Sequence, residues 1–168
     1  MLIRLYGIEL LASPSNSRAA PSDEFINDLA KLSKLVDRAE EILIFESPDA
    51  ASEAAAWLDR HEAVYEELEL VKLSSTASVR FEPGALYEDY AIIARSGNVI
   101  FDLKLVAAFR LTATKPDAEP APALLQLEEH LIGSLSSAEG SLHVIDRQLT
   151  PLADRIARAY GCASAWEC

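Results

Sequence analysis

Two aspartates and a lysine in the middle of the chain are spaced so that they could hold a divalent metal ion. Asp102 and Lys104 are two residues apart in an expected strand, so their side chains would point to the same face. Asp89 shares that face if the chain turns back through two residues near Gly97, and takes the opposite face if the loop spans 96–98. So arranged, the three residues would bind Mg²⁺ or Mn²⁺ and orient a water to attack a phosphodiester.

This spacing resembles the Asp…(Asp/Glu)-x-Lys signature of the PD-(D/E)xK nuclease superfamily. The expected order of elements over residues 48–147 is also similar to the core of that superfamily. The resemblance implies that Asp89 and Asp102 are metal ligands and that Lys104 orients the water or the phosphate. The alternative is that these charged side chains neutralise one another on one face of a sheet.

The net charge of the chain argues against a nucleic-acid substrate. There are 27 acidic and 15 basic residues among 168, which gives a net charge of −12 at pH 7. A negative surplus of this size repels phosphate backbones and anionic membranes. Residues 61–90 are especially acidic, because only Lys72 and Arg80 offset their carboxylates. An acidic surface there would attract a cationic protein and speed its association.

Tyrosines lie between these carboxylates, and tyrosine is favoured at the centres of protein interfaces. We therefore expect this stretch to contact a basic protein partner. The expected contact residues are Glu62, Tyr65, Glu66, Glu67, Glu69, Tyr87, Glu88 and Asp89, with Tyr90 as a further aromatic anchor. The alternative is a solvated face that serves solubility, with the tyrosines half-buried on strands.

Two functions follow from these patterns. The first is a non-enzymatic acidic domain, without a cofactor, that recognises and masks a basic protein, as small inhibitors and immunity proteins do. The second is a metal-dependent phosphodiesterase centred on Asp89, Asp102 and Lys104. The charge balance favours the first. A small-molecule cleft beside the sheet has no support beyond the fold class.

The cysteines and the apolar runs indicate the compartment. Cys162 and Cys168 form neither a Cys-x-x-Cys pair nor a disulfide framework, so we expect reduced thiols on a short tail over 162–168. Glu9 interrupts the first apolar run, and no run is long enough for a membrane span. These features predict a cytoplasmic protein.

The histidines are far apart and lack the spacing of metal ligands. His143 would share a strand face with Ser141, but no third partner for nucleophilic chemistry can be named. Asp146 falls on the opposite face of the same expected strand. A satisfied or solvent-exposed histidine is therefore the favoured interpretation.

The elements expected to position these residues alternate between strand and helix. Apolar residues at three-and-four spacing predict a helix over 23–40, and alternation in Glu67-Leu68-Glu69-Leu70 predicts a half-exposed strand. Together the patterns predict an α/β (α+β) fold with a single domain over 1–161. Its mixed sheet would have about six to seven strands with a central antiparallel hairpin over 90–112, and about four helices packed on it.

Overall fold

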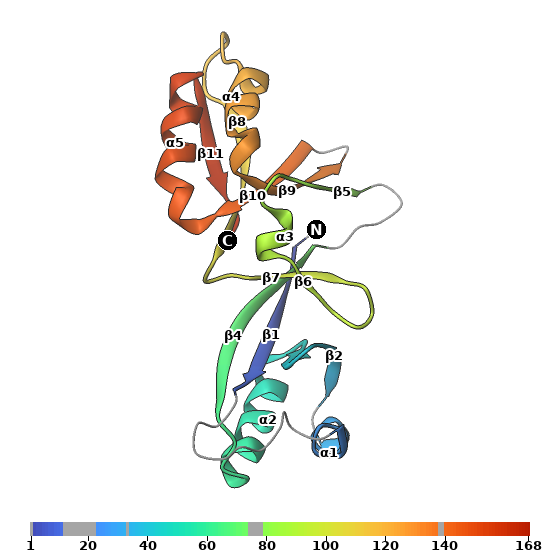
Figure 1. Ribbon diagram of the computed structural model, residues 1–168. Coiled ribbons are helices and arrows are strands. Elements are labelled where there is room, and N and C mark those ends of the chain that lie inside the picture. Colours follow the sequence, from blue (N-terminus) through green and yellow to red (C-terminus); the bar gives the residue numbers. More distant parts are fainter. Residues whose placement is uncertain (1, 12–22, 33, 74–78, 138–139) are drawn as a thin grey trace. The chain divides into compact units, whose positions relative to one another are not determined.

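The computed structural model describes residues 2–11, 23–32, 34–73, 79–137 and 140–168 (Figure 1). The chain divides into two compact units, and each is described by itself. The N-terminal unit comprises Ile3–Lys72 and Ile92–Ile100, and the C-terminal unit comprises mainly Leu73–Ala91 and Phe101–Cys168. The expectation of one domain over 1–161 stays a prediction.

The N-terminal unit is built on a six-stranded sheet in the order β2-β3-β1-β4-β7-β6 (Figure 1). The pairs β1–β3, β2–β3 and β6–β7 are antiparallel. The strands are β1 Leu2–Leu10, β2 Leu35–Ala39, β3 Ile42–Phe45, β4 Tyr65–Leu73, β6 Ile92–Ile93 and β7 Val99–Asp102. The helices are α1 Asp23–Leu32 and α2 Pro48–Arg60.

Both faces of this sheet bury apolar side chains. On one face, Ile8 and Phe45 pack against α1 and α2, and the inner alanines of α2 allow a close approach. On the other face, Leu5, Leu70 and Ile100 form a second cluster. Helix α2 begins where the side chain of Ser47 accepts a hydrogen bond from the backbone N–H of Ala50, which satisfies a free donor of its first turn.

The turn between β6 and β7 contacts the opposite edge strand, β2. The backbone N–H of Arg95 donates to the carbonyl of Arg38 at 2.7 Å. The carboxylate of Asp37 accepts hydrogen bonds from Ser96 and Asn98. Partial burial alone would raise the pKa of Asp37, but these bonds and one from the Arg38 N–H outweigh it and lower that pKa. The sheet is therefore curled around its second apolar cluster.

The helix expected over 23–40 ends at Leu32, and that prediction is wrong for its second half. Residues Leu35–Ala39 form β2, which pairs with β3 through a tight turn in which Glu40 has a φ of 48°. The apolar residues Leu35, Val36 and Ala39 continue the helical spacing of the residues before them, so the pattern alone predicts a longer helix. Pairing with β3 buries Ala39 and half-buries Leu35 in a strand instead, so tertiary contacts override the local pattern.

The C-terminal unit is built on a five-stranded sheet in the order β11-β8-β10-β9-β5. Its strands are β5 Arg80–Pro83, β8 Val106–Ala113, β9 Leu131–Ser137, β10 Gly140–Asp146 and β11 Cys162–Trp166. Its helices are α3 Tyr87–Tyr90, α4 Pro120–Leu127 and α5 Thr150–Ala159, with the short 3₁₀ turns η1 Glu128–His130 and η2 Arg147–Leu149. The sequence β8-α4-β9-β10-α5-β11 has the β-α-β-β-α-β order of a split βαβ arrangement.

Helices α4 and α5 cover one face of this sheet. Leu127 from α4 and Ile156 from α5 join Phe109, Leu131 and Ile145 in a common core cluster. The expected tail over 162–168 is wrong for most of its length, because Cys162–Trp166 form β11, paired with β8. Apolar residues anchor this strand: Cys162 is buried, and the Trp166 ring lies 5.0 Å from that of Phe109.

The mixed α/β class expected from the sequence is confirmed, but the strands form two sheets instead of one. The β6–β7 hairpin exists, with Ile92 opposite Ile100, and it is much shorter than expected. The expected strand 99–112 is divided by a turn at 103–105, so β7 and β8 belong to different sheets. No helix in the described part of the chain is long and apolar enough to cross a membrane.

Candidate functional site

Strand β4 places two carboxylates in water and the leucine that follows each of them in the core. Glu67 and Glu69 are exposed, whereas Leu68 and Leu70 are buried in the second apolar cluster of the N-terminal unit. The alternation read from the sequence is thus confirmed, because successive strand side chains point to opposite faces. The buried leucines fix the backbone that carries the two charges.

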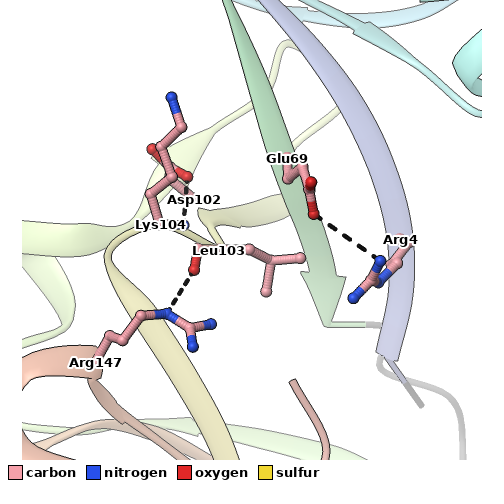
Figure 2. Close-up of polar contacts among 6 residues, drawn as sticks. All are labelled: Arg4, Glu69, Asp102, Leu103, Lys104 and Arg147. Carbon is pink, nitrogen blue, oxygen red and sulfur yellow. Dashed lines mark hydrogen bonds and ion pairs between the residues drawn. The ribbon is translucent and has the colours of Figure 1, made fainter.

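Arg4 on the neighbouring strand β1 is the cation found near this pair. Its Nη1 lies 3.9 Å from Oε2 of Glu69, and Figure 2 shows the two side chains reaching toward each other from adjacent strands. Both side chains are about two-thirds exposed, at 65% and 66%. An ion pair this open contributes little stability.

Tyr65 begins the same strand and interacts with the carboxylates of Asp59 and Glu67. Its hydroxyl donates a hydrogen bond of 3.0 Å to Oδ1 of Asp59 at the end of α2, and its ring packs on the core. Partial burial, the bond to Asp59 and the charges of Asp59 and Glu67 raise its pKa. Asp59 is a member of this acidic group that the sequence did not single out, because only the fold brings residues six apart into contact across a turn.

The other candidates are exposed at the start of β4 or lie in the other unit. Glu62 is exposed in the turn before β4 with a φ of 54°, and Glu66 is exposed on the strand. Glu88 and Asp89 are exposed on α3 of the C-terminal unit. The half-buried Tyr87 beside them lies with its ring 5.7 Å from that of Phe81. The expected contact residues therefore form two groups, one in each unit.

Tyr90, expected as a further aromatic anchor, is hydrogen-bonded within the C-terminal unit. Its hydroxyl donates to Oδ2 of Asp146 at the end of β10. This hydrogen bond, partial burial and the negative charges of Asp146 and Asp89 raise the pKa of Tyr90 to about 12. The polar end of Tyr90 thus links α3 to β10 within the C-terminal unit.

The change Tyr90→Phe is expected to lower the free energy of unfolding by about 1–2 kcal/mol below pH 10, because a hydrogen bond to a carboxylate is lost. Since the folded pKa exceeds the unfolded one, the contribution is present below pH 10 and disappears as the pH rises toward 12. Urea denaturation between pH 7 and 11 measures it. Tyr87→Phe serves as the control. A difference from wild type that persisted unchanged above pH 10 would contradict this account.

The three residues of the metal hypothesis are not on two neighbouring strands. Asp89 lies in helix α3, Asp102 ends β7, and Lys104 lies in the turn that follows. Figure 2 shows that Oδ1 of Asp102 accepts a 2.8 Å hydrogen bond from the backbone N–H of Lys104, while the Leu103 carbonyl accepts one from Arg147. The shared-face argument is therefore wrong, because Asp102 closes a turn where a continuous strand was expected.

Metal-ligating side chains do not gather elsewhere in the described ranges either. Among these residues, no group of three or more His, Cys, Asp or Glu side chains is placed to hold a metal ion. The phosphodiesterase hypothesis stays a prediction, without the shared strand face on which it was argued.

A buried histidine in the C-terminal unit has a partner that the sequence analysis missed. His143 on β10 is 4% exposed, and its Nδ1 lies 2.8 Å from Oγ of Ser134, the residue opposite it on β9. The expected face-mate Ser141 lies on the same strand as His143. The alternation Ser134-Leu135-Ser136 before Gly140 could have indicated β9 and its pairing.

Burial lowers the pKa of His143, and the charge of Arg110 lowers it further. The unfolded chain therefore binds this proton more readily, and stability should fall as the pH drops below about 6.5, by at most about 1.4 kcal/mol per pH unit. We expect His143→Gln to flatten the change in unfolding free energy between pH 7 and 5. Urea denaturation followed by Trp166 fluorescence, with Trp57 replaced by Phe, measures it. His130→Gln is the control, and an equally steep loss in His143→Gln would refute the assignment.

The best-defined candidate binding surface is on β4. Its backbone is held by buried leucines, and its exposed carboxylates are near the half-buried Tyr65. Such a surface can bind cationic groups without ordering a loop first, since a strand with buried neighbours is already rigid. Comparison of the chain with protein-family models, curated proteins and solved structures gives no match.

Proposed function

We propose that the chain is a non-enzymatic protein that recognises and masks a basic protein partner through the acidic residues of β4. The observation that carries this proposal is the position of Glu67 and Glu69. Both are exposed on a strand whose neighbouring leucines, Leu68 and Leu70, are buried. Because the backbone is fixed by its own core, binding would cost little ordering of the acidic side.

The electrostatics of the neighbourhood support a cationic partner. Asp59 and Glu67 act together on Tyr65, whose pKa rises in response to burial and to their charges. Arg4 offsets Glu69 only through an open contact. A basic surface approaching β4 would meet several carboxylates within reach, in a chain whose net charge of −12 also favours its approach.

We also include two exposed carboxylates of the C-terminal unit in the proposed binding surface. Glu88 and Asp89 stand on α3, whose Tyr87 and Tyr90 are half-buried. In this unit the tyrosines serve packing and the hydrogen bond to Asp146, so the carboxylates are the groups offered to a partner. We assign them a secondary, electrostatic contribution.

Co-purification from the native host tests the proposal. The tagged chain is compared with the double variant Glu67→Gln/Glu69→Gln and with a matched control, Glu46→Gln/Glu53→Gln, which removes the same charge from other exposed positions of the N-terminal unit. We expect wild type and control to retain one basic protein in stoichiometric amount and the β4 variant to lose it. Equal retention by the β4 variant, or no basic protein with wild type, would refute the proposal.

A further inference from the structure

The C-terminal unit contains a cavity of about 950 Å³ that the proposed function does not use. It lies between the end of β5 with the segment after it and the stretch from α4 to η1. Its size is at the upper end of the range, about 300–1,000 Å³, found for small-molecule sites. It belongs to one unit, so its shape depends on elements of that unit alone.

Apolar side chains form most of the wall. Leu124 and Leu125 come from α4, Leu131 begins β9, and Pro83 ends β5. Leu125 is 71% exposed, the highest value among the large hydrophobic residues that the structure describes. Burial of this exposed leucine side chain by an apolar ligand lowers the free energy of the bound state.

Two polar residues of the lining are in a defined arrangement. Glu82 on β5 and Ser134 on β9 are opposite each other in the register of the sheet, so both side chains belong to one face. The bond to buried His143 orients the Ser134 hydroxyl. When that hydroxyl donates to His143, the oxygen keeps lone pairs that can accept a hydrogen bond from a ligand.

Every charged residue among those described as lining the cavity is acidic. These residues are Glu82, Glu128 and Glu129. Arg80 stands 3.9 Å from Glu82, and the His130 ring 3.5 Å from Glu129, but both glutamates are more than half exposed. Such open pairs are weak, so the rim keeps a negative potential that attracts cations and repels carboxylates.

We propose that this cavity binds a small organic cation, an ammonium nitrogen carried on an apolar chain. The leucine wall takes the chain, and the glutamates with the Ser134 oxygen take the N–H donors. A ligand with only an apolar chain would leave the three carboxylates without a partner. A bare metal ion or a polyamine would leave the leucines uncovered. The proposal is independent of partner binding on β4, which lies in the other unit.

Titration of the ¹⁵N-labelled full chain with hexylammonium tests the proposal, with hexanoate and 1-hexanol as probes of equal chain length. We expect saturable shifts at the amides of Ala85, Gln126 and Ser134 with hexylammonium. Binding of hexanoate should be at least ten-fold weaker, because its charge has the wrong sign. Equal binding of all three probes, or shifts that avoid these amides, would overturn the proposal.

Variants separate the two halves of the lining. Glu82→Gln/Glu128→Gln should weaken hexylammonium binding about ten-fold and leave 1-hexanol unchanged, whereas the control Glu46→Gln/Glu53→Gln should alter neither. Leu125→Ser, at an exposed position that does not endanger folding, should weaken both probes. If the peptide acetyl-Leu-Lys-Leu-amide shifts the cavity amides and hexylammonium does not, the site serves a protein segment and the small-cation proposal fails.

Discussion

Gly84→Ala is expected to lower the free energy of unfolding of the C-terminal unit by about 3 kcal/mol or more. A Cβ at Gly84 would lie 2.3 Å from the carbonyl oxygen of Leu131 and 2.8 Å from its carbon. These are backbone atoms of β9, so no side-chain rotation relieves the contact. Separation of the two segments would also break the hydrogen bonds from Gly84 to Ile132 and from Leu86 to Leu131.

The fluorescence of Trp166 on β11, in a Trp57→Phe background, reports this unit during urea denaturation. Gly140→Ala, in the same unit, is the matched control: Gly140 has a φ of 114° with nothing near its missing Cβ, so that change should cost only about 1–2 kcal/mol of backbone strain. If Gly84→Ala costs no more than Gly140→Ala, the close packing of residues 84–86 on β9 is wrong.

Hydrophobic periodicity predicted the exposure of side chains correctly on β4. The Glu67-Leu68-Glu69-Leu70 alternation predicted which side chains are exposed, because a strand with one buried face imposes a period of two. The same reasoning failed for Leu35–Ala39, whose spacing fits a helix but whose pairing with β3 decides the outcome. The spacing of apolar residues does not show which strand will pair with a segment, and that pairing decided the structure here.

Turns without glycine or proline were the second source of error. The chain between β7 and β8 turns at 103–105, where Asp102 accepts a hydrogen bond from the N–H of Lys104. An aspartate favours such turns, but a polar residue after Val99-Ile100-Phe101 is equally compatible with a strand that continues. The missed turn removed the geometric basis of the metal hypothesis.

The contacts that define the sites lie between residues that are apart in sequence. Asp59 meets Tyr65 across the turn between α2 and β4, and Ser134 meets His143 across the β9–β10 pair. The first contact depends on the geometry of that turn and the second on a strand register, and sequence alone leaves both open. The acidic character of the surface was therefore predictable, whereas the identity of the carboxylate beside Tyr65 and the cavity beside Ser134 were not.

Reversal of charge on β4 is expected to have the largest effect on binding. Glu67→Lys/Glu69→Lys should slow association with the basic partner at low salt by ten-fold or more, because an attractive region becomes repulsive. Both side chains are exposed, so the fold should tolerate the change. Stopped-flow kinetics measures the rate, and Glu46→Lys/Glu53→Lys, with the same net charge, is the control. Equal slowing in both variants would assign the effect to net charge and contradict a role for β4.

The dependence of the association rate constant on ionic strength tests the central claim most directly. With the wild-type chain and the co-purified basic protein, the account predicts a steep fall between roughly 0.01 and 0.5 M salt, as screening shortens the reach of the carboxylates. The fall should be much shallower for Glu67→Gln/Glu69→Gln. A wild-type rate constant that stays the same across this range would contradict recognition of a basic partner by charge.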